Sequence, residues 1–596
     1  MAKKWRLLPQ KEGDLQSQLL ANRGLSKGEW GDWLEPNYER DVHDPFLMKD
    51  MDKAIKLVLE SVERGDRIAI FADYDADGVP GAVILSEWLK RVGHTNYEVY
   101  IPHRHEEDYG LSIKAIEGLA ANGCKILITI DCGITNVAEV ARAKELGMKV
   151  IVTDHHLLSD TVPSADAILN PKQADDEYPE KMLCGAGVIF KLAQGLLKAT
   201  TSGADFRGFT LKGSLPEVAT SSQAGDAESP PPTKADDAKS ALAFGKWLLD
   251  LVAIATVGDM VPLRGENRAL AYFGLKVLRR TRRPGLISLY RLLRLDPTHL
   301  TEDDIGFSIA PRINSASRMT HAEEAYELLS TADPARAMVL AEHLEKKNKE
   351  RKQWVEKILQ DEAVLEIAQQ DSPVLVAGSE DWNLGVLGLA CARLAEEHYR
   401  PVFLWGKNGS GLIKGSCRSD GNINVVELMK GAAEGLFAKQ GGHAMAGGFS
   451  VTPERLGELS DELNKSYAKL TAGSDEIEEA ELPLDYVLRL ADINEDTNAL
   501  VSALAPYGMG FNKPLFLLSQ VKLLGRRSFG ATNNHLELTV GDGEFSVKAV
   551  AFFQANTFTD ILNNHSMLDL AVHLEKSYFR GRPELRLRLT DLRPSG

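Results

Sequence analysis

Short apolar runs that end in acidic or histidine residues recur along the first part of the chain. Residues 68–72, 126–130 and 150–152 are almost wholly apolar, a pattern that predicts buried strands. Helical patterns over 82–91 and 136–146 separate these runs. Strands that alternate with helices predict an α/β fold with a doubly wound parallel sheet, in which the residues that end the strands share one edge.

The first of these strands ends in three alternating aspartates, Asp73, Asp75 and Asp77, before Gly78. Carboxylates at the edge of a buried sheet are costly unless something neutralises them, and oxygen ligands suit Mg²⁺ and Mn²⁺. Taken alone, the cluster fits an ordinary strand-to-helix turn equally well, because Asp and Gly are common there. The rest of the chain has to decide between the two interpretations.

Further candidate ligands end other apolar segments. In isolation a pair of histidines more often lies in an exposed turn. At an edge that also carries several aspartates, imidazole ligation of a metal is the favoured interpretation. The segments end in Asp131, in Asp154, His155 and His156, and in Asp259.

The bulk properties limit the class of protein. The 596 residues suggest three or four domains, and 44% hydrophobic residues allow a large core. The chain has no run of eighteen apolar residues, so we expect a soluble, cytoplasmic protein without a membrane span. Its five cysteines are scattered, which fits a reducing compartment and argues against structural zinc. The net charge of −16 opposes nucleic-acid binding at face value, but a phosphate-binding channel needs only local basicity.

The remaining segments add four expectations. The N-terminal tryptophans Trp5, Trp30 and Trp33 should pack onto a neighbouring domain. Residues 200–240, rich in Ser, Ala, Asp and Pro, predict a surface insertion. A long helix should run from Asp333 to about Ile367, and a second α/β pattern starts at 373.

From residue 516 onward, short strands at close intervals predict a small barrel. This segment holds ten Lys and Arg against eight Asp and Glu. Its mixture of cations and aromatic residues fits a platform for single-stranded nucleic acid, although each residue alone could be ordinary barrel surface or core. The platform candidates are Arg526, Arg527, Phe529, Tyr578, Phe579, Arg580 and Arg582.

Together the motifs resemble the DHH phosphoesterase superfamily, in particular its single-strand-specific DNA exonucleases, from about residue 46 to the C-terminus apart from the insertion. Two positions depart from the family pattern: Ser317, where Gly is usual, and Asn383, where His is common. The motifs are Asp73-Tyr-Asp-Ala-Asp-Gly78, Asp131-Cys-Gly133, Asp154-His-His156, Gly185-Ala-Gly187, Gly258-Asp-Met-Val-Pro-Leu263, Ile309-Ala-Pro-Arg-Ile-Asn-Ser-Ala-Ser-Arg318, Gly415-Ser-Cys-Arg-Ser419 and Gly441-Gly-His-Ala-Met-Ala-Gly-Gly448.

The resemblance implies a division of the chain into six parts. These are an N-terminal extension (1–45), a DHH catalytic domain (46–332, with the insertion at about 200–240), a connecting helix (333–370), a DHH-associated substrate-binding domain (371–470), a linker (471–515) and an OB-fold nucleic-acid-binding domain (516–596).

The resemblance also implies roles for individual residues around two divalent ions, Mn²⁺ or Mg²⁺. Asp73 would be a ligand or an orienting group, Asp154 would orient the histidines, and His156 would face the scissile phosphate. The metal ligands would be Asp75, Asp77, Asp131, His155 and Asp259, and the substrate contacts Arg104, Arg312, Asn314, Arg318, Ser416, Arg418 and His443.

The implied activity is 5′-to-3′ hydrolysis of single-stranded DNA to 5′-mononucleotides in recombination and repair. The implied enzyme is a monomer that works with a RecQ-type helicase and single-strand-binding protein. Two alternatives compete: a phosphodiesterase for short oligonucleotides or cyclic dinucleotides, and a non-catalytic scaffold that binds single strands. The predicted barrel and the chain length disfavour the first alternative, and the complete ligand set disfavours the second.

Overall fold

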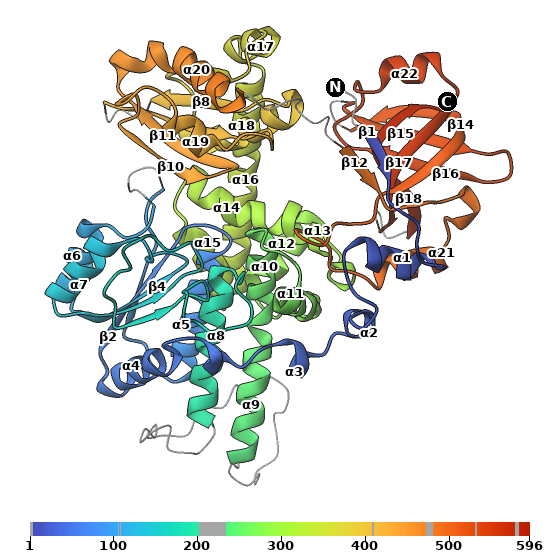
Figure 1. The fold of residues 1–596 in the computed structure, drawn as a ribbon. Helices are drawn as coiled ribbons and strands as arrows, with labels where there is room; N and C mark the ends of the chain where they lie inside the picture. The colour runs from blue at the N-terminus through green and yellow to red at the C-terminus, as the bar shows by residue number, and fades with distance from the viewer. Residues whose placement is uncertain are drawn as a thin grey trace.

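Three larger sheets, each with its own helices, make up the molecule (Figure 1). The computed structural model describes residues 4–104, 107, 109–201, 234–407, 411–472, 481–530, 533–578 and 583–595. Most of the insertion expected at 200–240 therefore lies outside the described residues, as do Phe579, Arg580 and Arg582.

The first sheet is parallel throughout, with the strand order β3-β2-β4-β5-β6. Along β2, Ile68 and Ile70 pack into one apolar cluster, whereas Ala69 and Phe71 pack into another on the opposite face. Helices cover both faces, so the predicted doubly wound fold is confirmed. The strands are β2 (Arg67–Ala72), β3 (Tyr97–Tyr100), β4 (Cys124–Ile130), β5 (Lys149–Thr153) and β6 (Ala167–Leu169).

Helices on the two faces differ in how far they extend the core. The helices on the same face as α4 build the larger apolar cluster, and α6 and α7 pack over the smaller one on the opposite face. The larger cluster holds α4 (Met51–Arg64), α5 (Gly78–Arg91) and α8 (Gly185–Thr201), and the smaller one α6 (Ile113–Ala121) and α7 (Val137–Glu145).

Helix α5 begins at Gly78, earlier than the pattern over 82–91 predicts. A Cβ atom at Gly78 would lie 2.3 Å from the main-chain oxygen of Asp73. The glycine therefore lets the aspartate loop fold directly against the first turn of the helix, which brings the loop's acids to the edge of the sheet.

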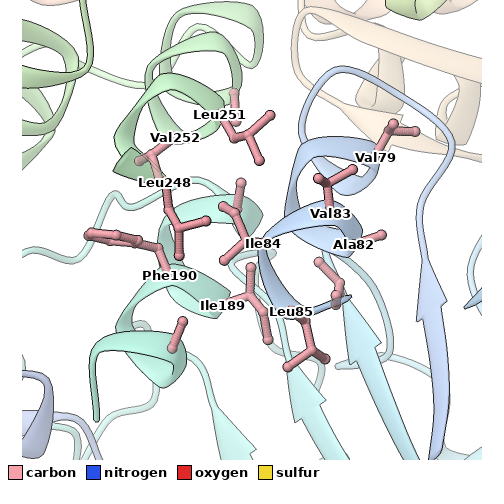
Figure 2. Packing of buried hydrophobic residues seen from close by; sticks show 14 of the residues in the cluster. Val79, Ala82, Val83, Ile84, Leu85, Ile189, Phe190, Leu248, Leu251 and Val252 are labelled. Carbon is pink, nitrogen blue, oxygen red and sulfur yellow. The ribbon is translucent and has the colours of Figure 1, made fainter. Parts of the chain in front are cut away.

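The larger cluster continues into a group of helices that follow the sheet in sequence. Figure 2 shows Leu248, Leu251 and Val252 packed with residues of α5 and α8, such as Ile84 and Phe190. The helices of this group are α9 (Lys234–Trp247), α10 (Leu249–Gly258), α11 (Gly265–Leu278), α12 (Pro284–Leu293), α13 (Glu302–Asp304), α14 (Ala310–Met319) and α15 (Glu323–Ser330), with the 3-10 turn η2 (Pro297–His299) and the π-helical turn η3 (Ile305–Ile309). A further 3-10 turn, η1 (Pro45–Leu47), precedes the sheet in sequence.

One stretch of this group, Ser240–Gly258, is long and apolar enough to cross a membrane, with a mean hydropathy of 1.6. Most of it is buried inside the protein, 61% of the window, against α5 and α8 (Figure 2). Its length and apolar composition are therefore those of a core helix.

The connecting helix α16 (Pro334–Leu359) begins where it was predicted, with Asp333 accepting a hydrogen bond from the main-chain N–H of Ala335. The predicted continuation to Ile367 is wrong. The helix ends at Leu359, and Asp361 caps a separate helix, α17 (Glu362–Gln369).

The second sheet follows α16, with the order β10-β11-β9-β8-β7. Only β7 and β8 are parallel, so this sheet is mixed. Its elements are β7 (Leu375–Gly378), α18 (Leu384–His398), β8 (Val402–Lys407), β9 (Ile413–Arg418), α19 (Val425–Lys430), β10 (Lys439–His443), β11 (Ala446–Val451), η4 (Pro453–Glu458) and α20 (Leu459–Thr471).

The predicted C-terminal barrel is confirmed, and one long strand closes it. Strand β14 (Phe516–Phe529) pairs with both β15 and β17, with a register shift between Leu518 and Val521. The other elements of this part are β12 (Glu481–Leu484), β13 (Tyr486–Val487), η5 (Leu490–Asp492), α21 (Glu495–Ser502), β15 (His535–Gly541), β16 (Ser546–Ala551), α22 (Thr559–Asn564), β17 (Met567–Ser577) and β18 (Glu584–Pro594).

The N-terminal tryptophans pack onto this distant part of the chain. The ring of Trp33 lies 4.1 Å from that of Phe511, centroid to centroid, and Trp5 Nε1 donates to Asp591 at 2.8 Å. The segment's elements are β1 (Lys4–Leu7), which pairs in parallel with β12, and α1 (Leu15–Asn22), α2 (Trp30–Leu34) and α3 (Tyr38–Asp41). The N-terminal segment thus joins the C-terminal part, through β1 and Trp33, to the helices of the first sheet, where the Tyr38 ring lies 5.5 Å from that of Phe273.

Candidate metal centre and phosphate-binding surface

The carboxyl edge of the first sheet gathers the predicted ligands. The aspartate loop follows β2, Asp131 follows β4, and the Asp154–His156 segment follows β5. Asp259 ends helix α10 and not a strand. Three groups have ligand atoms within 4.8 Å of one another: Asp131, His155 and His156; Asp77, His155 and Asp259; and Asp73, Asp75 and Asp131.

Three of the acids at this edge are buried, and no Lys or Arg of the described part of the chain forms a salt bridge with them. Asp73, Asp77 and Asp131 are each at most 4% exposed. One oxygen of Asp73 and one of Asp131 have no hydrogen-bond partner among the described residues. Unpaired buried carboxylates are expensive, so the arrangement fits a site for cations.

The electrostatics of the edge support this interpretation. Burial and the negative charge of Asp75 raise the pKa of Asp77 to about 7, and burial and Asp77 raise the pKa of Asp259 to about 9. Burial, followed by the charge of Asp77, raises the pKa of Asp131 well above its usual range. Each acid destabilises the charge of its neighbours, and bound cations would remove that repulsion.

Main-chain groups hold the aspartate loop in place. Both carboxylate oxygens of Asp77 accept hydrogen bonds, at 2.6 Å, from the N–H groups of Gly185 and Ala186 at the start of α8. The side chain of Asn314 on α14 accepts from the N–H of Ala76 at 2.8 Å. The Gly185-Ala-Gly187 motif therefore acts as a backbone cradle for one of the acids.

Two positions at this edge need unusual backbone. Asp131 has a φ of +61°, and a Cβ atom at Gly185 would lie 2.5 Å from the Cβ of Asp131. The helix α8 can approach the acid only because residue 185 has no side chain.

His155 reaches three acids through one nitrogen. Its Nε2 lies 3.2 Å from Asp131, 3.7 Å from Asp259 and 3.8 Å from Asp77. Burial, and then the positive charge of His156, lowers the pKa of His155 to about 3. The imidazole is therefore neutral at physiological pH, which is the form that binds a metal.

Asp154 contacts both histidines of the pair. One of its oxygens accepts from the N–H groups of both histidines and lies 2.7 Å from Nδ1 of His156. Burial alone would lower the pKa of His156, but the hydrogen bond and charge of Asp154 raise it. His156 is thus suited to carry a proton beside the metal ligands.

The donor set fits hard divalent cations. It offers carboxylate oxygens and one neutral imidazole nitrogen, the donors that Mn²⁺ and Mg²⁺ accept. Asp131 and His155 each belong to two of the three groups, so the groups are contiguous and can hold two ions side by side. Asp75 also caps the loop, because it accepts from the N–H groups of Asp77 and Gly78. Asp73 keeps an unpartnered oxygen, which makes it a stronger ligand candidate than its sequence position suggests.

Four guanidinium groups lie close enough to influence one another beside this edge. Burial and the positive charges of Arg104, Arg351 and Arg418 lower the pKa of Arg318 to about 9. Arg318 donates to the main-chain oxygen of Gly385 at 3.0 Å and so links α14 to the second sheet's helix α18. Such crowded cations fit a polyanion. They come from the part of the molecule built around the first sheet (the first body), from the second sheet, and from the helix α16 between them.

The other predicted substrate contacts have different surroundings. Arg312 forms a buried ion pair with Glu345 of α16 at 2.9 Å, so it joins two helices. Ser416 and Arg418 are two residues apart on β9, so their side chains share one face of the sheet. His443 is exposed on the edge strand β10, which lies on the side of the second sheet that is toward the first sheet (Figure 1).

The two departures from the family pattern have local structural roles. Asn383 caps α18 by accepting from the N–H of Gly385 at 2.9 Å. The hydroxyl of Ser317 donates to the main-chain oxygen of Asn314.

Three residues near the site were not identified from sequence. The hydroxyl of Tyr109 donates to the main-chain oxygen of Asp131 at 2.9 Å and lies 3.1 Å from His156 Nδ1. Lys172 donates to the main-chain oxygen of His155, and Arg351 joins the guanidinium group. Tyr109 and Lys172 lie in segments that carry candidate residues, but no spacing rule distinguishes them from surface residues.

Several side chains of the predicted barrel platform already contact other residues of the protein. Arg527 pairs with Glu537 at 2.7 Å, Arg526 donates to Asn563, and Tyr578 stacks on His299 with ring centroids 3.7 Å apart. Phe529 joins an aromatic cluster with His535.

Three family models match the chain. They are the N-terminal domain of the DHH family over residues 67–212, the DHHA1 domain over 371–469 and the RecJ OB domain over 484–591. The matches follow the order of the three larger sheets.

Known proteins resemble the chain over most of its length. It is 31% identical to the single-stranded-DNA-specific exonuclease RecJ of Haemophilus influenzae over 572 residues, 93% of this chain and 92% of that protein. RecJ of Bacillus subtilis is 33% identical over 90% of this chain, which spans 63% of that relative.

Solved structures agree with this similarity. The crystal structure of Thermus thermophilus RecJ in complex with Mn²⁺ has a TM-score of 0.75 and 27% identity, covering 100% of this chain and 80% of that one. The same protein in complex with Mg²⁺ has a TM-score of 0.70, with 26% identity, covering 100% of this chain and 79% of that one.

Proposed function

Because this chain belongs to the RecJ family of single-stranded-DNA-specific exonucleases, we propose that it hydrolyses single-stranded DNA with two divalent cations, Mn²⁺ or Mg²⁺. We further propose that it works from the 5′ end and releases 5′-mononucleotides in recombination and repair. The observation that carries the proposal is the set of buried, mutually repelling acids beside a group of arginines.

The residues at the edge of the first sheet would hold the two ions. Asp73, Asp75 and Asp131 form one set of donors, and Asp77, His155 and Asp259 another, with Asp131 and His155 close to both. When bound, two divalent cations supply an activated water and stabilise the leaving oxygen of a phosphodiester.

The remaining groups of the site position protons and phosphates. Asp154 holds His156 through Nδ1 and favours its protonated form, so His156 can stabilise the scissile phosphate or donate a proton to the leaving oxygen. Asp154 also fixes the main chain of both histidines and so controls how His155 faces the acids.

The guanidinium group supports recognition of a strand end. A terminal phosphate carries more charge than an internal one and has more free oxygens, so it is the better partner for several cations. Arg104, Arg318 and Arg418 would grip that phosphate, since burial and then the neighbouring guanidinium charges lower the pKa of Arg318, and an anion would offset those charges.

The competing phosphodiesterase function would use the same metal centre on short substrates. The C-terminal barrel favours the longer substrate, because OB folds bind several nucleotides of a single strand.

The test compares Mn²⁺-dependent hydrolysis of a long 5′-phosphorylated single strand with hydrolysis of a dinucleotide. We expect the long strand to be degraded much more efficiently, with mononucleotides as the first products. Preferential hydrolysis of the dinucleotide would favour the alternative, and strand binding without metal-dependent hydrolysis would favour the scaffold.

The family also suggests partners and a setting, which we include in the proposal: a RecQ-type helicase, single-strand-binding protein, a monomeric state and a cytoplasmic location. Light scattering of the purified chain tests the monomer, and co-purification with each candidate partner tests the complexes. A stable dimer would contradict the first, and co-purification of neither partner would contradict the second.

A further inference from the structure

A row of aromatic and cationic side chains runs from the first body of the molecule onto the barrel. It begins at Phe307 in the π-helical turn η3, which is 67% exposed. Arg588 on β18 lies over this ring, with its guanidinium carbon 5.8 Å from the ring centroid. Arg586 lies two residues earlier on the same strand and therefore on the same face of the sheet.

The row continues across the barrel. The guanidinium carbon of Arg586 lies 5.7 Å from the ring centroid of Phe552. Phe552 lies 5.5 Å from His535, and His535 lies 4.6 Å from Phe553, centroid to centroid. Phe553 is 68% exposed, so both ends of the row present an open ring to solvent.

The chemistry of the row suits a single strand of nucleic acid. Exposed aromatic rings offer faces on which bases stack, and the guanidinium groups between them match a chain of phosphates. An apolar protein partner would instead need a continuous apolar surface, which the interleaved arginines interrupt.

Acidic neighbours hold the arginines in position. Arg586 pairs with Glu575 at 2.6 Å, and a guanidinium nitrogen of Arg588 lies 3.8 Å from Asp303. Asp303 also pairs with Lys513. The Arg586 guanidinium is therefore held beside the Phe552 ring before any ligand arrives, which reduces the cost of ordering it.

The row starts on the turn that leads into the helix contacting the aspartate loop. Turn η3 runs directly into α14, whose Asn314 holds the aspartate loop. Asn314 follows Phe307 by seven residues, which is about 10 Å along a helix. A strand that reaches the acids would therefore be within reach of the Phe307 ring.

We propose that this aromatic row carries the part of the substrate strand that has not yet been cut, and that Phe307 stacks on a base near the metal centre. The proposal rests on the proposed function and assigns a positioning residue to the body that carries the metal centre, outside the barrel. The row would keep the strand aligned between successive cleavages.

The test measures KM for a long single strand and for a dinucleotide in the metal-loaded, full-length enzyme. For Phe307→Ala we expect KM for the long strand to rise by about 5- to 150-fold, the loss expected from one stacked base. KM for the dinucleotide should change far less, because so short a substrate does not reach the row. Phe307→Trp should restore most of the affinity for the long strand.

A matched control is Phe545→Ala. Phe545 is 43% exposed on the same barrel but lies in the turn between β15 and β16, at the opposite end from His535. Equal effects of Phe307→Ala and Phe545→Ala, or an equal effect of Phe307→Ala on both substrates, would overturn the proposal. A wild-type enzyme that cannot degrade the long strand would instead contradict the proposed function.

A second pair of variants tests the row on the barrel. Phe552→Ala should also raise KM for the long strand selectively. Arg588→Gln should reduce the dependence of log KM on log salt by roughly 0.7, the value for one phosphate contact on a single strand. An unchanged salt dependence together with an unchanged KM in Phe552→Ala would overturn the path across the barrel.

Discussion

Two sets of buried charges in this protein have opposite compositions. At the edge of the first sheet, five acids are brought together with no Lys or Arg in a salt bridge to any of them among the described residues. Between α8 and α11, the acid Glu266 is also buried but pairs with Lys191 and accepts hydrogen bonds from the Tyr178 hydroxyl and the main-chain N–H of His43.

The difference separates a structural cluster from a site. The Lys191 network is satisfied by the chain itself, and it pins the N-terminal segment through the main-chain oxygen of His43. The acid cluster is unsatisfied and raises the pKa values of its own members. Repulsion of this kind is relieved when an external cation binds, so the cluster marks a candidate site.

The largest effect should come from removing one acid of the cluster. For Asp131→Asn we expect Mn²⁺-dependent hydrolysis of a long single strand to fall by about a thousandfold or more, because the acid lies in two ligand groups. Asparagine also tolerates the φ of +61° at this position. In chelator, the variant should be at least as stable to urea as the wild type, because one repelling charge is gone.

The control for this variant is Asp175→Asn, which changes an exposed acid paired with Lys49. It should leave both the rate and the stability unchanged. An active Asp131→Asn enzyme, or one that loses stability in chelator, would contradict the contrast between the two sets of charges.

Breaking the paired set should have the opposite signature. Lys191→Met leaves Glu266 buried without its cation, and we expect the free energy of unfolding to fall by about 3–5 kcal/mol in urea titrations. Lys198→Met, on the same helix but half-exposed, should cost less than about 1 kcal/mol. Equal losses in the two variants would show that burial of this pair does not matter.

Glu302 of α13 is a third kind of buried acid, and its removal should have a smaller effect, on the pH dependence of the free energy of unfolding. Burial and the charge of Asp303 raise the pKa of Glu302 from 4.5 to about 7. Between these values the folded state binds more protons than the unfolded state. The stability contributed by this group is therefore present below pH 4.5 and is lost as the pH rises through 7.

Glu302→Gln should remove this dependence and make the protein more stable at pH 8, by an amount on the order of 3 kcal/mol. Urea titrations at pH 5 and pH 8 measure the change. Glu396→Gln, an exposed glutamate of α18, is the control. A variant that keeps the wild-type pH dependence would contradict the assignment to Glu302.

Much of the fold follows from local pattern. Apolar runs marked β2, β4 and β5, and Asp333 with Pro334 marked the start of α16, because burial and capping act over a few residues. The end of α16 was missed, since the cap at Asp361 competes with a continuing helical pattern. The pairing of β1 with β12 joins segments far apart in the chain, which no local pattern encodes.

The amino-acid sequence by itself determined the metal chemistry of this protein. Acids and histidines that end successive parallel strands must meet at one edge, so Asp73, Asp77, Asp131 and His155 could be grouped without coordinates. Only the tertiary structure decided what surrounds them. Helix packing sets whether an acid keeps a free oxygen, as Asp73 does, or has both oxygens bonded by another helix, as Asp77 has. The contact between Phe307 and Arg588 likewise depends on how two bodies of the molecule meet, because their positions in sequence carry no information about that distance.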